Sequence, residues 1–131
     1  MKQELVQTEM LVEFNPKTSF TIICKGLLVS IEFDAIPHIS KYGNQTVIYT
    51  SDSCYKTCSS LQEILHDLPV NEFFRVHRSH IVSLKHVTGI KKIKMKVADN
   101  WLPMSAYYKR QIVKSLGRVL NSWYESFLLL Q

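Results

Sequence analysis

The stretch that decides the fold is residues 73–84, FFRVHRSHIVSL. Six of its side chains are typical of a protein core, and all except Val76 lie at its two ends: Phe73, Phe74, Val76, Ile81, Val82 and Leu84. Between them lies RVHRSH, which is dense in hydrogen-bond donors. Arginine binds guanine edges or phosphate, and serine donates to phosphate. Because apolar anchors hold such a turn rigidly, we interpret the segment as a turn that presents donors to nucleic acid.

The roles of the polar side chains in this turn differ. Arg75 and His77 can fix the turn through backbone carbonyls without meeting a ligand, and we favour that role for His77. Arg78 and Ser79 are then the expected contacts, with Arg78 the stronger because its guanidinium makes bidentate bonds.

Charge is distributed unevenly along the chain. Residues 1–70 hold five Lys/Arg and eight Asp/Glu, a balance of −3, whereas residues 71–131 hold eleven and three, a balance of +8. This asymmetry favours a polyanionic partner, with nucleic acid ahead of membrane. Charge alone leaves equally open a basic domain that binds nothing in particular.

Length and composition indicate one folded domain in the cytoplasm. The chain has 131 residues, of which 46% are apolar and 21% charged. No apolar run approaches the roughly 18 residues of a membrane span, and the first eleven residues carry two acids rather than a signal-peptide core. Three irregularly spaced cysteines are poor material for a disulfide framework.

Most of the chain before residue 70 reads as short strands. Alternating apolar residues predict strands at 20–24, 28–33 and 46–50, and a further one near 54–57. A helix then begins at Ser60, where Glu63 completes a capping box, and ends at Pro69.

The second half predicts more strands and a terminal helix. Strands are expected at 81–82, 87–90 and 101–104 and within 90–97, where Ile93, Met95 and Val97 would point inward and Lys92, Lys94 and Lys96 outward. For these lysines we favour a solvated sheet face over DNA contact. Helical spacing begins after Ser105, and the apolar tail 121–131 would pack on its own domain or on a second copy.

Catalysis and metal binding have little support. The chain lacks a phosphate-cradling glycine loop, and no nucleophile turn accompanies His77, Ser79 and His80. Cys54, Cys58 and His66 lack a fourth ligand at a standard distance, so buried free cysteines are the ordinary expectation. We expect no enzyme activity, no catalytic residue, no metal and no other cofactor.

At residues 73–83 the sequence resembles the LytTR family of DNA-binding domains in bacterial transcription regulators. The family core Phe-x-Arg-x-His-x-Ser-x-x-Val-Asn is matched except at Ser83, where asparagine is usual. The similarity covers roughly residues 20–116. It includes Asp34-Ala35-Ile36, the predicted helix within 57–65, and the LPMS of residues 102–105.

The resemblance implies a mainly β, elongated, antiparallel sandwich-like fold. About ten strands are expected, with one short internal helix and a C-terminal helix. Loops rather than a recognition helix would enter successive major grooves of promoter DNA. We expect the domain to span residues 19–118, after an extension at 1–18 and before a helical extension at 119–131 that could contact a second copy in a homodimer on DNA.

The resemblance also implies contact residues. Asn44 aligns with a base-reading loop residue, with Gln45 beside it, and both amides suit adenine. Ser60 falls where a helix start meets phosphate. Arg78 and Ser79 match the second contacting loop.

The third contacting loop departs from the family pattern. Ala106 stands where an arginine is common, while Tyr107, Lys109 and Arg110 can still reach phosphates. Affinity for the backbone is therefore expected to persist while base readout is weakened here. The alternative is a protein-interaction module that keeps this fold but has weakened DNA readout; Ala106 and the apolar tail favour it.

Overall fold

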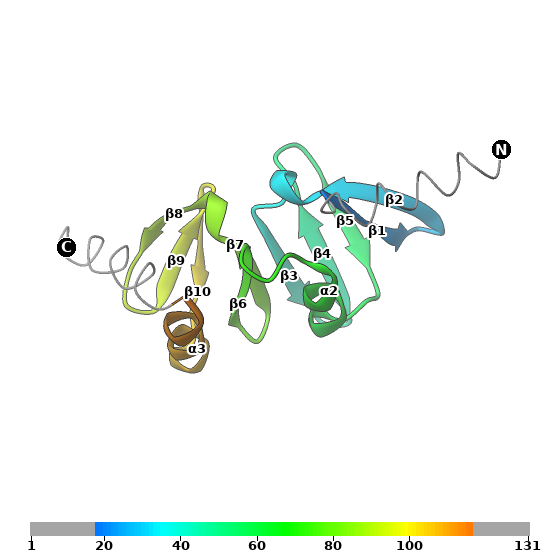
Figure 1. Ribbon diagram of the computed structural model, residues 1–131. Helices are drawn as coiled ribbons and strands as arrows, with labels where there is room; N and C mark the ends of the chain where they lie inside the picture. Colours follow the sequence, from blue (N-terminus) through cyan, green and yellow to red (C-terminus); the bar gives the residue numbers. More distant parts are fainter. Residues whose placement is uncertain (1–17, 117–131) are drawn as a thin grey trace, which may run out of the picture.

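Ten strands form three antiparallel sheets in a row in this computed structural model, which describes residues 18–116 (Figure 1). The first sheet pairs β1 (Ser19–Cys24) with β2 (Leu27–Glu32). The second has the order β5-β4-β3-β7-β6 and contains β3 (His38–Tyr42), β4 (Gln45–Tyr49), β5 (Cys54–Thr57), β6 (Phe73–His77) and β7 (His80–Ser83). The third contains β8 (Val87–Ile90), β9 (Lys94–Val97) and β10 (Asn100–Pro103). The predicted fold class is confirmed.

Within residues 18–116, two α-helices and two short 3-10 helices complete these elements. They are α2 (Leu61–Asp67), α3 (Ala106–Leu116), η1 (Phe33–Ala35) and η2 (Leu84–His86). The capping box of α2 forms as predicted: Glu63 N donates to Ser60 Oγ over 3.1 Å, and Ser60 N donates to Glu63 Oε1 over 2.9 Å. No helix within residues 18–116 is long and apolar enough to cross a membrane.

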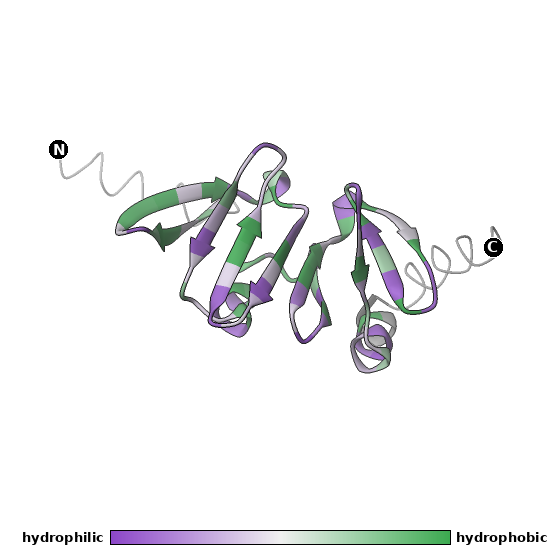
Figure 2. Cartoon of the chain, turned by 180° about the vertical axis from the view of Figure 1, so that it is seen from behind, coloured by the Kyte–Doolittle hydropathy of each residue, from purple (hydrophilic) through white to green (hydrophobic). Residues whose placement is uncertain are grey.

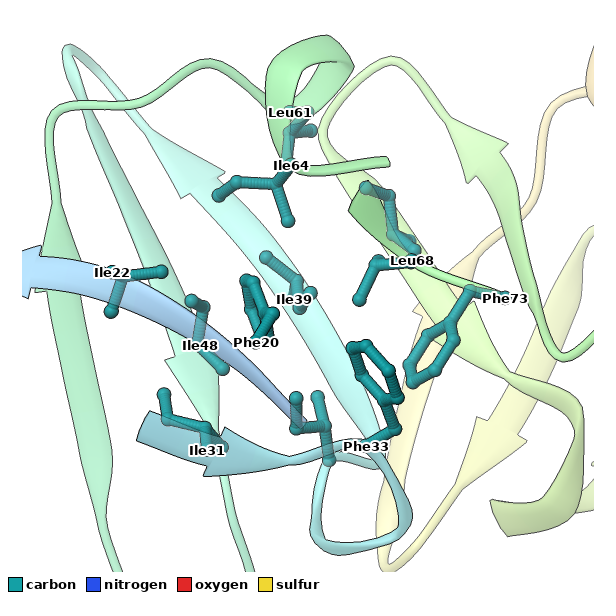
Figure 3. Close-up of a cluster of buried hydrophobic side chains, with 12 residues drawn as sticks. Phe20, Ile22, Ile31, Phe33, Ile39, Ile48, Leu61, Ile64, Leu68 and Phe73 are labelled. Carbon is teal, nitrogen blue, oxygen red and sulfur yellow. The ribbon is translucent and has the colours of Figure 1, made fainter. Parts of the chain in front are cut away.

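The first core lies between the β1–β2 hairpin, helix α2 and the five-stranded sheet (Figure 3). The ring of Phe33 connects these layers, because it stacks on Phe20 with centroids 5.6 Å apart and meets Phe73 edge-on at 6.3 Å. Ile39 and Ile48 of the central strands are fully buried beneath them.

The second core lies between the β6–β7 hairpin, the three-stranded sheet and α3. Its buried members are Val76, Val82, Ile90, Met95, Val97, Leu102, Met104 and Ile112. Successive strand residues point to opposite faces, so Ile81 enters the first core while Val82 enters the second. The hairpin is thus packed on both faces.

Some sequence expectations were wrong. Arg75 and His77 belong to strand β6 rather than to the turn, which is only Arg78-Ser79. Ile93 lies outside β9 and is 65% exposed, because the strand begins only at Lys94. No strand was predicted where β3 forms.

The cysteines also differ from expectation. Cys54 and Cys58 are exposed and Cys24 is half-buried. Cys54 faces solvent because it is the first residue of β5, which is an edge strand. The predicted extension 1–18, apart from Thr18, and the predicted extension 119–131 with its apolar tail lie outside the described residues. The expected apolar stripe of the terminal helix is described only at Ile112, which is buried.

Candidate nucleic-acid interface

The β3–β4 and β6–β7 turns lie side by side at one edge of the molecule. Strands β3 and β7 are paired with Ser40 opposite His80, and the backbone amide of Lys41 donates to the carbonyl of Ser79 over 2.9 Å. Asn44 and Gln45 are exposed at the first turn, and Arg78 is exposed at the second. Two segments far apart in sequence therefore present polar side chains at the same edge (Figure 1).

The starts of both α-helices lie at this edge too. Beside the β3–β4 turn, Thr46 Oγ1 donates to the carbonyl of Ser59 over 2.7 Å, which holds the first turn of α2 next to β4. On the other side, Ser105 N donates to the carbonyl of Val76 over 2.8 Å, which holds the start of α3 next to β6. The order along the edge is α2, β3–β4 turn, β6–β7 turn, α3.

Arg75 and His77 fix the β6–β7 turn from strand β6. The Arg75 guanidinium donates to two backbone carbonyls, through Nε to His77 over 3.4 Å and through Nη2 to Arg78 over 2.5 Å. His77 Nδ1 accepts from the backbone amide of Ser79 over 3.1 Å. The predicted anchoring through carbonyls is confirmed for Arg75, whereas His77 acts by accepting an amide.

The Arg75 guanidinium also faces α3. Its Cζ lies 5.7 Å from the centroid of the Tyr108 ring, within the range of a cation–π contact. One side chain thus joins the β6–β7 turn to the start of the last helix. This linking role was not expected from the sequence, since nothing in it places Tyr108 near Arg75.

A buried hydrogen-bonded network lies behind the same turn. Ser40 Oγ is 2.7 Å from Nδ1 of His80 and 3.2 Å from Nδ1 of His38, which is 4% exposed. Burial lowers the pKa of His38 to about 4, with a smaller contribution from nearby His80. Burial also lowers the pKa of His80, and His77 adds to this effect. Neutral imidazoles therefore lie behind the β6–β7 turn at physiological pH.

The β3–β4 turn has a backbone that suits a tight hairpin. Gly43 has a φ of 59°, in the left-handed region where a side chain is strained, and Asn44 follows at the tip. Tyr42 precedes the turn, is 54% exposed, and accepts a hydrogen bond from the hydroxyl of Tyr49 over 3.1 Å. Tyr42 and Lys41 join the edge although no sequence signal singled them out.

The start of α3 carries the remaining predicted residues. Tyr107 is 58% exposed and Arg110 is also exposed, whereas Lys109 is half-buried and its ammonium lies 3.4 Å from the carbonyl of Lys92. Ala106, the first residue of the helix, is exposed. The structure therefore brings every predicted contact residue to one edge, with Ser60 at its far end.

Two positive charges at this edge, those of Arg78 and Arg110, have no acidic partner among the described residues. The salt bridges within residues 18–116 join Lys85 to Asp34 and to Glu72, at 2.8 and 2.5 Å. Arg78 and Arg110 form none with the described residues. The described part of the chain also holds no group of three His, Cys, Asp or Glu that could bind a metal ion.

The β3–β4 and β6–β7 turns are coloured hydrophilic in Figure 2, as expected for a polar surface.

The sequence and the fold are similar to those of known proteins. Residues 26–117 match the family model described as the LytTr DNA-binding domain. Among solved structures, the LytTr DNA-binding domain of a response regulator from Bacillus cereus is 23% identical, with a TM-score of 0.66 over 78% of this chain and 99% of that one. No curated protein sequence matches the chain.

Proposed function

Because the chain belongs to the LytTr DNA-binding domain family, we propose that it binds double-stranded DNA as a transcription regulator, through turns inserted in successive major grooves. The observation that supports this most is the alignment of two turns and two helix starts on one edge, where Arg78 and Arg110 form no salt bridge with the described residues. These segments are spread along an elongated molecule. This arrangement can follow a DNA duplex, in which the major groove recurs about every 34 Å.

The two turns are proposed to read bases. The side-chain amides of Asn44 and Gln45 can form paired hydrogen bonds with adenine, and the guanidinium of Arg78 can form them with guanine. Ser79 is held beside Arg78 and can donate its hydroxyl to phosphate. Since Arg75 and His77 hold the backbone of this turn, the backbone loses little conformational entropy when Arg78 binds.

The helix starts are proposed to contact phosphates. Tyr107, Lys109 and Arg110 supply a hydroxyl and two positive charges at α3. The contact at Ser60 is weaker in this proposal, because the Glu63 carboxylate already accepts from Ser60 N and places negative charge beside it. Hydrogen bonds from Ser60 lower the pKa of Glu63 and keep that charge in place.

Two copies on promoter repeats are part of the proposal. Regulators that bind as dimers meet half-sites spaced by whole helical turns. The tail 121–131 is the proposed contact between copies, and it lies outside the described residues.

Arg78→Ala tests the proposed reading turn. Binding to duplex DNA should weaken by about 1–3 kcal/mol, because one bidentate contact is lost. Gel-shift titrations over a range of salt concentrations measure this effect, and wild-type affinity should fall steeply with salt as counterions are released. Lys25→Ala, in the β1–β2 turn away from the edge, is the matched control. Equal binding by Arg78→Ala and wild type would remove Arg78 from the interface.

A second candidate is a protein-interaction module with weakened DNA readout. Ala106 supports it, and so does an apolar surface on the β1–β2 hairpin, where Ile23, Leu27 and Leu28 are 63%, 68% and 76% exposed. This candidate replaces the first if the wild-type protein shows no salt-dependent retention on DNA at low ionic strength and co-purifies with a partner protein.

A further inference from the structure

We propose that the β8–β9 loop, with Lys91 and Lys92, is an additional phosphate-binding segment that lengthens the DNA interface beyond α3. This inference rests on the proposed function. It separates these two lysines from Lys94 and Lys96, which lie on strand β9. The sequence pattern placed Lys92 with Lys94 and Lys96 on the outward face of one strand, whereas the fold places Lys92 in the loop, next to Lys91.

The loop is attached to the start of α3 by two hydrogen bonds. The amide of Met104, two residues before the helix, donates to the carbonyl of Ile93 over 2.7 Å. The ammonium of Lys109 lies 3.4 Å from the carbonyl of Lys92. Figure 1 shows the loop between β8 and β9 on the same side of the molecule as α3. The order of segments along the edge therefore continues past α3 to this loop.

The loop also has a fixed shape. The amide of Lys91 donates to the carbonyl of Lys94 over 2.8 Å, which closes the turn. The ammonium of Lys91 lies 4.8 Å from the centroid of the Trp101 ring, a cation–π distance, and Trp101 is itself 41% exposed. Lys91 and Lys92 are both exposed. Two positive charges are thereby held at the surface in a closed turn.

These charges lack local neutralisation. Residues 73–98 contain no Asp or Glu, and neither Lys91 nor Lys92 forms a salt bridge with the described residues. Lys85 is the contrast, because it bonds to both Asp34 and Glu72. Because the loop is attached to the start of α3, Lys91 and Lys92 strengthen the positive potential at this end of the edge, which favours a polyanionic ligand.

The chemistry of the loop selects phosphate rather than bases. A lysine ammonium is a compact point charge, whereas base discrimination in the major groove relies mainly on forked or amide groups. Neither an amide side chain nor an arginine occurs in residues 90–97. The loop should add affinity equally for all sequences and extend the protected backbone at one end of the site.

The test is the salt dependence of binding by K91Q/K92Q. Each phosphate contact contributes about 0.9 to the slope of log affinity against log salt, so the double variant should lose roughly 2 from the wild-type slope. The probe is a mixed-sequence duplex of about 30 base pairs, measured by fluorescence anisotropy. K25Q/K56Q removes the same charge from the β1–β2 turn and from β5, and should keep the wild-type slope. K91R/K92R should also keep it.

The outcomes separate this inference from the proposed function. If wild-type binding has no salt dependence, the proposed function fails and the inference fails with it. If wild type binds with a steep slope and K91Q/K92Q has the same slope, only the inference is overturned, and the loop is a solvated connection. A loss of slope equal in K25Q/K56Q would also overturn it, because the effect would then reflect net charge and not position.

Discussion

At the scale of single residues, the Ser40 hydroxyl constrains the tautomers of two histidines. It lies 3.2 Å from Nδ1 of His38 and 2.7 Å from Nδ1 of His80. A hydroxyl has only one proton to donate, so one ring must donate its own Nδ1–H to the serine oxygen. The network is therefore complete only when one imidazole is in the Nδ1–H tautomer, and no buried side-chain polar atom in the described residues lacks a partner.

The burial of His38 leads to a pH prediction. Its pKa is about 4 in the folded protein against 6.5 ordinarily, so between these values the unfolded chain binds more protons. The contribution of His38 to stability is complete above pH 6.5 and is lost as pH falls toward 4. The loss is at most about 3 kcal/mol. The lowered pKa of His80 acts in the same direction.

Urea unfolding at a series of pH values measures this effect. His38→Phe keeps an aromatic ring against Tyr49, whose ring lies 4.5 Å from that of His38, but cannot bind the proton. Its unfolding free energy should change less between pH 7 and pH 4 than that of wild type. His66→Gln, on the exposed side of α2, is the control and should follow wild type. Parallel curves for His38→Phe and wild type would contradict the prediction.

At the scale of elements, the β6–β7 hairpin depends on the forked shape of Arg75. Its guanidinium reaches the carbonyls of His77 and Arg78 together. Lysine keeps the charge but has no planar fork, so Arg75→Lys should leave one carbonyl unbonded at a net cost of about 1 kcal/mol. DNA affinity should fall several-fold through the loosened turn.

Salt titration distinguishes this positioning role from direct contact. Because Arg75→Lys preserves charge and Arg75 lies behind the turn, the salt slope should stay at the wild-type value while affinity falls at every salt concentration. Arg75→Ala should likewise keep the slope. A slope reduced by about one in Arg75→Ala would mean that Arg75 itself binds a phosphate.

The elements that were predictable have strong local signals. Helix α2 has a capping box, an apolar period and a terminating proline, and all three are confirmed. Strand β3 was missed because polar residues fill buried positions: His38 and Ser40 flank Ile39, and all three are buried. A buried strand whose inward groups are satisfied by hydrogen bonds shows no apolar alternation, so its sequence resembles a loop.

The candidate site was predictable in its parts and not in its assembly. Arg78 and Ser79 are recognisable from a donor-rich turn between apolar anchors. The attachment of the β8–β9 loop to α3 has no sequence signal, because it is formed by the backbone carbonyls of Lys92 and Ile93. Backbone acceptors are present at every residue and carry no sequence signature. The position of this loop beside α3 is therefore known only from the hydrogen bonds in the structure.

At the scale of the whole molecule, the two cores share one hairpin. Phe73 and Ile81 belong to the first core, and Val76 and Val82 belong to the second. The β6–β7 turn is at the tip of this shared hairpin, and the proposed interface extends over both halves. The distances between the proposed contact segments stay matched to a DNA duplex only if the two halves do not unfold separately.

We therefore expect the described domain to unfold as one cooperative unit. Ile48→Ala removes buried volume from the first core and Met95→Ala from the second, each at a cost of about 2–5 kcal/mol. Native-state hydrogen exchange should show that either substitution lowers the protection of the slowest amides equally in β4 and in β9. The two variants are reciprocal controls. If Ile48→Ala lowered protection only in β4 and Met95→Ala only in β9, the halves would open independently, and the hairpin would join two separate units.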